Sequence, residues 1–315
     1  MKILITGATG FVGKNLIEHL LKDDHQLTIT SSGAENQLPD EVYDFPICQA
    51  ARKHKVLYYS LEGIDWKCVY GQDAVIHLAA NNDTRCQDES EMLRANLYGP
   101  IGLFTKAAQG GCKNFVYASS TAVYGNEESP YVEGLTPEKP LNLYGDSKKR
   151  FEDFAMKFAE ESEVKVVGLR YCNIYGPGEE HKGKRMSMIG QLFRKMMKGE
   201  KPTLFKSGEQ RRDWVYVEDV VDANMLAISS EESGIYNIGS GVATSFNELI
   251  YEIDEVIGVG WSGALPPNYI DCPFEDEYQS HTCCNIEKAK SHLGYQPKHD
   301  LATGLNRYFE YLNRS

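Results

Sequence analysis

The first 21 residues, MKILITGATGFVGKNLIEHLL (1–21), combine a short apolar strand, a glycine-rich turn and an amphipathic helix. Gly7, Gly10 and Gly13 fall in the turn. Glycine is needed there because the turn is tight, because a pyrophosphate must approach the backbone, and because the helix must pack closely on the strand. The N-terminus of the helix then faces the anion. The stretch therefore predicts a dinucleotide-binding site at the start of an α/β domain.

Short apolar runs alternate with helical patterns through the first half of the chain. The runs cover residues 2–6, 26–31, 55–59, 74–79, 114–118 and 165–170. Two sets of apolar residues between the runs fit helical stripes: Met92, Leu93, Leu97, Ile101 and Phe104, and Phe151, Phe154, Ala155 and Phe158. Continuous apolar strands separated by helices are typical of a parallel sheet covered on both faces. We expect an α/β fold with a Rossmann-type doubly wound parallel sheet.

The composition and the periodicity of the sequence change after Arg170. Loops rich in glycine and proline, with short helices between them, replace the regular alternation. This composition is typical of a smaller, loop-rich region that binds substrate. We predict an NAD(P)-binding Rossmann domain over residues 1–170 and a smaller C-terminal α/β substrate-binding lobe over residues 171–315, with some segments of the lobe returning to the large sheet.

The composition limits the classes of partner. Lys and Arg total 33 against 45 Asp and Glu, so the formal net charge is −12. This balance argues against nucleic acid or an anionic membrane as a partner, and any anionic ligand must meet a local cluster of positive charge. The apolar runs are too short to span a membrane and no signal peptide precedes the first strand, so we expect a cytoplasmic protein.

The eight cysteines are scattered through the chain without a CxxC pair. Zinc ligands and disulfide frameworks usually show regular cysteine spacing. We therefore expect free thiols and no metal site.

The end of the second strand bears on the choice of cofactor. NAD-binding folds usually place Asp or Glu there to bind the ribose 2′-hydroxyl, whereas this chain has Ser31 followed by Ser32. A serine can bond either a hydroxyl or a 2′-phosphate, and the missing carboxylate removes repulsion toward that phosphate. The expected cofactor is NADP, slightly preferred, or NAD.

A candidate for proton transfer lies at the start of a predicted helix. Tyr144 and Lys148 are four residues apart, so both side chains project from one helix face. A phenol with a pKa near 10 is a poor base at neutral pH, and a nearby ammonium lowers that pKa by favouring the phenolate. Ser120 follows the fifth strand, at the sheet edge where open α/β sheets bind ligands. Its hydroxyl is placed to bond a sugar oxygen while Tyr144 exchanges the proton.

Five motifs together resemble one family. TGATGFVG (6–13), VIHLAA (75–80), YASSTAVYG (117–125), YGDSK (144–148) and RYCNIYGP (170–177) look like the extended short-chain dehydrogenase/reductases that act on nucleotide-sugars. The resemblance implies a bound nicotinamide cofactor, a Ser-Tyr-Lys catalytic set, a lobe that binds a nucleoside diphosphate sugar, and homodimers formed through the helices that begin near Met92 and Tyr144.

The resemblance also implies roles for individual residues. Ser120, Tyr144 and Lys148 take the catalytic roles, and Lys148 also binds the nicotinamide ribose. Further cofactor contacts are expected at Phe11, Val12, Leu78, Ala79, Ala80, Asn96, Ala118, Tyr171 and Ile174. Substrate contacts are expected at Ser120, Thr121, Asn173, His181, Leu204, Phe205, Arg212 and Tyr278. Arg212 would bind a phosphate; the alternative is a surface arginine paired with Asp213.

Within the family, the second half of the chain is most similar to ADP-glyceromanno-heptose 6-epimerases. The similar stretches include EKPLNLYGDSK (138–148), GPGEEHKG (176–183) and GEQRRDWVYVEDV (208–220). The resemblance places Lys182 opposite Tyr144 across the sugar, as a second catalytic group for oxidation and re-reduction at carbon 6. The alternative is a solvated lysine, since Lys184 and Arg185 make the whole loop basic.

Other functions stay open at this point. The chain lacks the Asp-Glu pair that 4,6-dehydratases of the family carry after the catalytic hydroxyl, because Thr121 and Ala122 stand there. A UDP-glucose/galactose-type 4-epimerase and a net nucleotide-sugar dehydrogenase or reductase are the alternatives. A non-catalytic Rossmann sensor is disfavoured because both Tyr144 and Lys148 are present.

Overall fold

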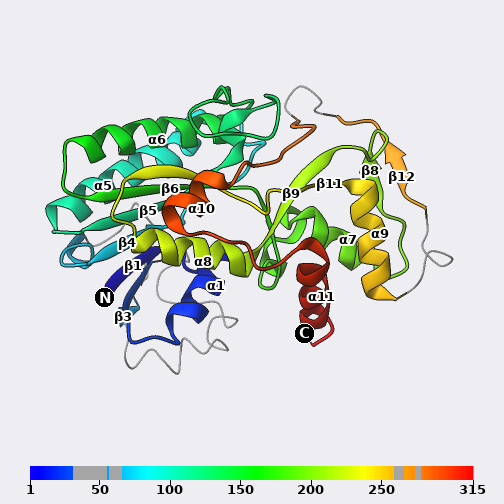
Figure 1. Ribbon diagram of the computed structural model, residues 1–315, viewed down its shortest axis with the longest axis horizontal. Coiled ribbons are helices and arrows are strands. Elements are labelled where there is room, and N and C mark those ends of the chain that lie inside the picture. The colour runs from blue at the N-terminus through cyan, green and yellow to red at the C-terminus, as the bar shows by residue number, and fades with distance from the viewer. Residues whose placement is uncertain (31–54, 57–65, 259–265, 274–277, 315) are drawn as a thin grey trace.

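The computed structural model of the chain describes residues 1–30, 55–56, 66–258, 266–273 and 278–314. Its main feature is a seven-stranded sheet in the order β10-β6-β5-β4-β1-β2-β3 (Figure 1). All neighbouring strands in it run parallel, which confirms the predicted sheet. The strands are β1 (Lys2–Thr6), β2 (Gln26–Thr30), β3 (Lys55–Val56), β4 (Ala74–His77), β5 (Asn114–Ser120), β6 (Lys165–Tyr171) and β10 (Gly234–Ile238).

The central strands are buried on both faces, as parallel sheets usually are. All four residues of β4 are buried, and so are residues 3–6 of β1. Strand β5 continues beyond its predicted end to Ser120, and β6 continues to Tyr171. Both strands therefore deliver polar side chains to the carboxyl edge of the sheet. The predicted strand residues 31 and 57–59 lie outside the described residues.

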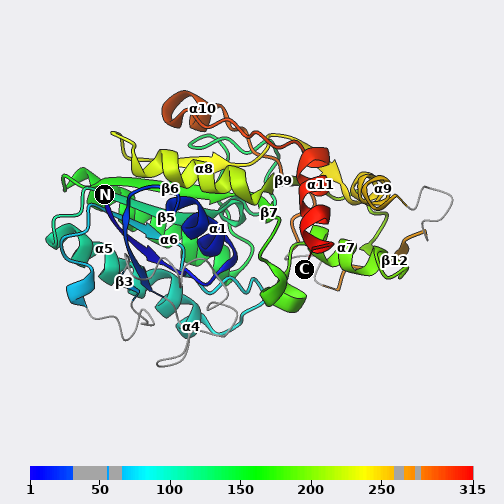
Figure 2. The same cartoon turned by 90° about the horizontal axis from the view of Figure 1, so that it is seen from below.

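Helices cover the two faces of the sheet (Figures 1 and 2). One face carries α4 (Glu89–Leu93), the π-helical turn η2 (Arg94–Tyr98), α5 (Gly99–Gln109) and α6 (Leu143–Glu160). The other carries α1 (Phe11–Leu20) and α8 (Val217–Ile228). The predicted stripe from Met92 to Phe104 runs through α4, η2 and α5, and its Met92, Leu97 and Phe104 are buried. The helical pattern was thus correct, although the helix changes type along its length.

The C-terminal part of the chain builds a separate core beside the sheet (Figure 1). A small sheet contains β7 (Asn173–Tyr175), β9 (Arg211–Tyr216) and β11 (Ala243–Ser245), and β8 (Thr203–Phe205) pairs with β12 (Asn268–Ile270). Around them pack α7 (Met188–Met196), α9 (Phe246–Ile257) and α11 (Leu301–Leu312), which share buried residues such as Phe193, Leu249 and Leu305. Shorter helices are η1 (Trp66–Cys68), η3 (Thr121–Tyr124), η4 (Glu180–Arg185) and α10 (Glu287–Leu293).

The chain crosses between the two parts more than once. Strand β10 comes late in the sequence yet pairs with β6 at the edge of the large sheet. A division at residue 170 is therefore a simplification of the chain path, and the domain boundary stays a prediction.

The topology also fixes where a ligand can bind. The order of the strands reverses between β1 and β4, since the chain proceeds from β1 outward to β3 and then returns to β4. Open α/β sheets bind ligands at such a switch point, outside the carboxyl ends of the strands. Gly7 follows β1 and Leu78 follows β4, so both lie at this point.

The expectation of free thiols is wrong for two cysteines. The structure pairs Cys172 with Cys284, 112 residues apart in sequence, in a disulfide. Cys172 directly follows β6, and the segment around Cys284 lies against the loop after β10. Spacing rules address local pairs, so they miss a pair that only the tertiary fold brings together. Cys68, Cys86, Cys112, Cys272 and Cys283 are free, and Cys48 lies outside the described residues.

Within the described chain, no helix combines the length and apolar character that crossing a membrane requires.

Phe104 tests the core between α5 and the sheet. Its side chain is fully buried and its ring centroid lies 4.6 Å from that of Phe115. We expect Phe104→Ala to lower the free energy of unfolding by about 3–5 kcal/mol, because the large cavity cannot be refilled. Leu135→Ala is the control, since Leu135 is 81% exposed and should change stability by less than about 0.5 kcal/mol. Urea unfolding measures both, and similar small losses would contradict the described packing.

Candidate active site

A cavity of about 960 Å³ lies at the switch point, along the carboxyl edge of the large sheet. It brings together most of the residues that the sequence predicts for cofactor binding and catalysis. These are Gly7, Gly10, Phe11, Val12, Gly13, Leu78, Ala79, Ala80, Ala118, Ser120, Tyr144, Lys148, Tyr171, Ile174, His181 and Lys182. Residues from five strand ends and from α1, α6 and η4 thus converge on one space.

The glycine turn forms one wall of the cavity. Gly7 has φ +70°, and a Cβ atom there would lie 2.6 Å from the backbone nitrogen of Ala79. A Cβ on Gly13 would collide with the carbonyl oxygen of Gly7. Gly10 caps α1 without a side-chain hydrogen bond, so the first amides of the helix face the cavity. A tight turn, close packing and an uncapped helix N-terminus are the features that fit a dinucleotide pyrophosphate.

Tyr144 enters the cavity from the first turn of α6. Asn142 starts the helix by accepting a hydrogen bond from the amide of Gly145 at 2.9 Å. Burial raises the pKa of Tyr144 above its ordinary value, and a hydrogen bond with Ser120 opposes this rise. The opposing influence therefore comes from Ser120, whereas the sequence analysis expected it from the Lys148 ammonium. The Lys148 nitrogen lies 5.8 Å from the centroid of the Tyr144 ring.

Lys148 lies one turn farther along α6 and is 5% exposed. Its Nζ donates a hydrogen bond to the carbonyl oxygen of Ala118 at 2.9 Å, which ties α6 to the end of β5. Burial lowers the pKa of Lys148 to about 8, and the charge of Glu152 partly offsets the effect. Burial, together with the charge of Lys148, lowers the pKa of His77 to about 3. At neutral pH Lys148 is therefore mostly cationic at the cavity wall, whereas His77, buried in β4, is neutral.

Ser120 completes the predicted catalytic set. It is the last residue of β5, and its hydroxyl accepts a hydrogen bond from the amide of Ala122 at 3.1 Å, which begins η3. Because the backbone amide of Ala122 fixes this oxygen, Ser120 is positioned by the fold rather than by a ligand. The Ser120 hydroxyl is thus held beside Tyr144, where it can bond a ligand oxygen while Tyr144 exchanges the proton.

The loop that carries Lys182 packs against the glycine turn. The Asn15 amide of α1 donates hydrogen bonds to the carbonyl oxygens of Phe11 and Pro177, both at 3.0 Å. Lys182 is partly buried, and its Nζ lies 4.7 Å from the centroid of the Phe11 ring. Burial lowers the pKa of Lys182, and the nearby Glu179 opposes this effect. Lys182 therefore lines the cavity, on the wall that the glycine turn provides.

A second group of predicted residues surrounds Arg212. This guanidinium is 7% exposed and lies over the rings of Tyr278, at 4.8 Å, and Phe246, at 5.6 Å. Tyr278 in turn contacts Phe205, with 5.7 Å between ring centroids. Among the described residues, no carboxylate lies within ion-pair distance of Arg212; its one hydrogen bond goes to the carbonyl oxygen of Arg211. A buried cation without a protein counter-ion is costly unless an anion binds to it.

The alternative pairing of Arg212 with Asp213 is wrong. The Asp213 carboxylate accepts hydrogen bonds from Ser240, from the amide of Gly241 and from the amide of Cys284. Successive residues of a strand point to opposite faces, so the two side chains diverge.

The remaining predicted substrate residues link the two groups. Asn173 donates hydrogen bonds to the carbonyl oxygen of Asp213 and to the Thr282 hydroxyl, at 3.3 Å and 3.2 Å. Thr121, next to Ser120, accepts a hydrogen bond at its carbonyl oxygen from the Gln279 amide at 3.4 Å. Leu204 is buried at 3% exposure in strand β8. Asn173 and Thr121 are chain neighbours of the cavity residues Ile174 and Ser120, and they contact the segments that carry Arg212 and Tyr278. The Arg212 group therefore lies beside the cavity.

Asn96 and Ser31 are two predicted cofactor residues whose roles stay predictions. Asn96 does not line the cavity, because its side chain is bound to the backbone of Asn81 and to the Ser147 hydroxyl. It supports the cavity wall from behind. Ser31 lies outside the described residues.

The sequence did not point to the remaining lining residues, which are Thr9, Thr30, Asn81, Asn82, Glu91, Arg94, Ala95, Gly99, Ser119, Cys172 and Arg185. Most of them come from loops and helix surfaces without a motif, and only their distance from Gly7 in the fold reveals them.

Comparison with known proteins identifies the group to which the chain is related. The model of the NAD dependent epimerase/dehydratase family matches residues 3–239. The structure is similar to that of Helicobacter pylori ADP-L-glycero-D-manno-heptose-6-epimerase, with a TM-score of 0.86 and 32% identity over 100% of this chain and 96% of the other.

Two further solved structures resemble it. UDP-glucose 4-epimerase from Thermotoga maritima, solved with UDP-glucose, has a TM-score of 0.87 and 27% identity, covering 100% of this chain and 99% of its own. MoeE5 in complex with UDP-glucuronic acid and NAD has a TM-score of 0.84 and 28% identity, with the same coverage. The predicted relationship to the extended short-chain dehydrogenase/reductases is confirmed. With its glycine turn, its Ser-Tyr-Lys group and this full-length similarity, the chain belongs to the NAD-dependent epimerase/dehydratase family.

Proposed function

We propose that the chain is a nucleotide-sugar epimerase that inverts one carbon by transient oxidation and re-reduction, with an ADP-linked or other nucleotide-linked heptose as the favoured substrate. The observation that carries the proposal is the buried guanidinium of Arg212, which has no carboxylate partner among the described residues and lies beside a cavity that contains Tyr144 and Lys148. A fixed guanidinium is well suited to bind a diphosphate.

The charge distribution supports an anionic substrate. The chain carries a formal net charge of −12, so a diphosphate is repelled by most of its surface. Lys148, Lys182 and Arg212 concentrate positive charge in and beside the cavity. Each of them is at least partly buried, where a charge acts more strongly than at the surface.

The chemistry assigns one task to each residue. The glycine turn and the start of α1 would hold a nicotinamide dinucleotide, which would supply the reversible uptake of a hydride. Tyr144 takes the proton of the substrate hydroxyl as the carbonyl forms, and it gives the proton back when the carbonyl is reduced. The hydroxyl of Ser120 opposes the rise that burial causes in the pKa of Tyr144, and the ammonium of Lys148 would stabilise negative charge that develops on the substrate oxygen. Because oxidation and reduction cancel, no net oxidant is consumed.

Inversion requires that hydride return to the opposite face of the carbonyl. The carbonyl must therefore be presented in two orientations, and each needs a proton donor. Lys182 is the proposed second donor, since its amine enters the same cavity as Tyr144 from a different wall. The resemblance of the HKG loop to heptose 6-epimerases supports this assignment. A UDP-sugar 4-epimerase is the alternative within the family.

A panel of ADP-, GDP- and UDP-linked hexoses and heptoses tests the proposal. The purified protein is incubated with each sugar, and the products are identified by NMR. Conversion of a heptose to its carbon-6 epimer is the expected result. Inversion at carbon 4 of a UDP-hexose would favour the alternative, and stoichiometric release of reduced cofactor with a keto product would indicate a net dehydrogenase.

Three finer points stay predictions. The slight preference for NADP rests on Ser31, outside the described residues, and binding titrations with NAD and NADP decide it. A homodimer and a cytoplasmic location are both expected from the sequence, and sedimentation and fractionation test them.

Tyr144→Phe should lower turnover by about 10²- to 10⁴-fold, the effect of losing a positioned acid/base. Cofactor binding should stay within about twofold of the parent, because the ring still packs in the wall. Steady-state kinetics and cofactor titration measure the two effects. Tyr251→Phe, on the outer surface of α9, is the control. Turnover within tenfold of the parent would remove Tyr144 from the mechanism.

Arg212→Met should raise the substrate KM by about 10- to 100-fold, as expected for losing a hydrogen bond to a charged group. The effect on kcat should be small, because the phosphate contact persists through the reaction. Arg211→Met is the matched control, since Arg211 is more exposed and pairs with Glu248. An equal KM in both variants would show that Arg212 does not bind substrate.

Lys182→Met should lower epimerisation by about 10²-fold or more, while cofactor affinity and folding persist. Cofactor affinity must be measured beside the rate of epimerisation, because Lys182 lies over Phe11, on the cofactor side of the cavity. Lys198→Met, at an exposed position after α7, is the control. If cofactor affinity falls in parallel with activity, Lys182 binds the cofactor and is not the second proton donor.

A further inference from the structure

A buried network of charged and polar groups lies behind the catalytic pair. The Ser119 hydroxyl donates a hydrogen bond to Glu152 at 2.5 Å, and Arg170 donates to the same carboxylate at 2.9 Å and 2.6 Å. Ser119, Glu152 and Arg170 are 3%, 1% and 2% exposed. Charged side chains are seldom buried this deeply unless they are paired. None of the roles proposed above for substrate or cofactor uses these three residues.

The network joins the catalytic helix to the catalytic strand. In the sheet, Ser119 of β5 pairs with Arg170 of β6, so both side chains point to the face covered by α6. Glu152 meets them from α6, one turn after Lys148. Lys148 binds Ala118, and Glu152 binds Ser119. Two successive turns of α6 are thus bonded to two successive residues of β5, directly before Ser120.

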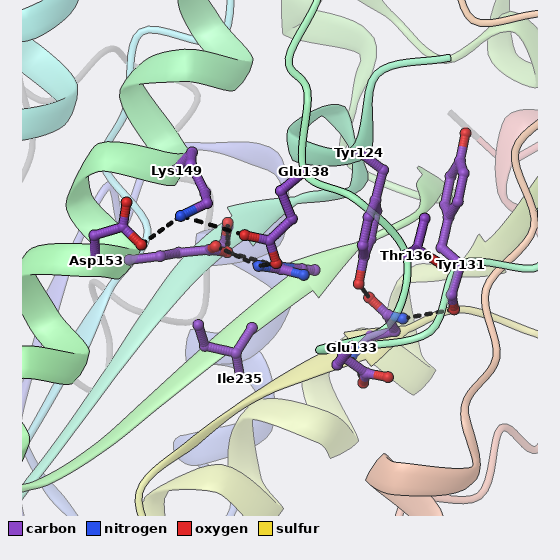
Figure 3. A network of polar contacts seen from close by, with 12 residues as sticks. Tyr124, Tyr131, Glu133, Thr136, Glu138, Lys149, Asp153 and Ile235 are labelled. Carbon is purple, nitrogen blue, oxygen red and sulfur yellow. Dashed lines mark hydrogen bonds and ion pairs between the residues drawn. The ribbon is translucent and has the colours of Figure 1, made fainter. Parts of the chain in front are cut away.

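Arg170 balances the charge of the network. Its guanidinium also contacts Glu138 and lies 4.8 Å from the centroid of the Tyr124 ring. Figure 3 shows Lys149 between Glu138 and Asp153, with a contact to each. Tyr124 donates a hydrogen bond to Asn237 at 2.8 Å, which extends the network to β10. Arg170 therefore has two acidic partners, and of these only Glu152 acts on the pKa of Lys148.

The groups around Lys148 show why the carboxylate of Glu152 affects the charge of this lysine. Three ionisable groups interact with Lys148 directly, and these are Glu152 and Tyr144 on α6 and His77 on β4. Their own ionisable neighbours are Arg170 on β6, which binds Glu152, Tyr117 on β5, which the charge of Glu152 affects, and Tyr171 on β6, which Tyr144 affects. His77 is neutral, and burial raises the pKa of Tyr117 and Tyr171 far enough to keep them neutral as well. Glu152 is the only carboxylate in this set. It is therefore the group whose charge favours the ammonium of Lys148.

We propose that Glu152 is a positioning residue for the reaction: it fixes the Ser120 end of β5 against α6 through Ser119, and it supplies the negative charge that keeps Lys148 cationic at working pH. This inference rests on the proposed function of the Ser120–Tyr144–Lys148 group. It adds a residue that touches neither substrate nor cofactor.

If Glu152 has this role, its removal should change the dependence of kcat on pH. Activity that depends on a cationic Lys148 falls as the pH rises through the pKa of that lysine, which burial sets at about 8 in the presence of Glu152. The charge of Glu152 raises the pKa of Lys148, so removing this charge should lower that pKa. The alkaline limb of the profile, in which kcat falls with rising pH, should then move to lower pH. Activity is therefore lost first between neutral pH and pH 8.

Glu152→Gln and Glu138→Gln form a matched pair. Each removes one carboxylate from Arg170 and leaves the other, so the arginine keeps a counter-ion in both variants. We expect the alkaline limb of Glu152→Gln to move down by about one pH unit, the lower end of what a neighbouring opposite charge supplies. The limb of Glu138→Gln should stay in place. Glu152→Asp, which keeps the charge, should return the limb toward that of the parent.

The results distinguish a purely structural role of Glu152 from a failure of the proposed function. Equal pH profiles in Glu152→Gln, Glu138→Gln and the parent, with similar losses of thermal stability, would overturn the proposal and make Glu152 purely structural. If Glu152→Gln does not fold, the double variant Glu152→Gln/Arg170→Met removes both charges of the buried pair. The limb should then move in the same direction but less far, because the positive charge of Arg170 is lost as well. If the parent chain epimerises no sugar of the panel, the proposed function has failed, whatever Glu152 does.

Discussion

The site depends on the contact between the buried ammonium of Lys148 and the carbonyl oxygen of Ala118. This contact fixes α6 against β5, so that Tyr144 from the helix and Ser120 from the strand end meet in one cavity. A lysine buried to this degree loses its hydration and needs compensation from the protein. The carbonyl oxygen and the nearby carboxylate of Glu152 provide it. The geometry of the catalytic group is therefore inseparable from the packing of one helix on one strand.

The chain is acidic as a whole, but it concentrates positive charge at the site. Its positive charges gather where an anionic ligand would bind, and each is fixed in a different way. The amides at the start of α1 are oriented by the glycine turn. Arg212 is oriented by two aromatic rings, and Lys182 by a loop bonded to α1. A chain with a net charge of −12 can thus attract a dinucleotide and a diphosphate to one place and repel them elsewhere.

The parts of this arrangement that local chemistry determines could be predicted from the sequence. The glycine turn, the alternating strands and the spacing of Tyr144 and Lys148 each reflect a short-range constraint, and the structure has all three. The lining residues without a motif could not be predicted. Neither could the Cys172–Cys284 disulfide nor the contact of Glu152 with Ser119, because they join segments that only the tertiary fold brings together. The position of Asn96 behind the cavity wall could not be predicted either, since a motif position does not reveal which neighbour the side chain binds.

The central claim is that one carbon is inverted by removing and returning a hydride within the cavity that contains Tyr144. The most direct measurement runs the conversion of the active nucleotide-sugar in D₂O and determines by NMR whether the inverted carbon gains deuterium. The account predicts that the product keeps its original hydrogen at that carbon, because a hydride that is taken up and returned inside the site does not exchange with solvent. Deuterium at the inverted carbon would contradict the account, since it would show that the carbon loses a proton and not a hydride.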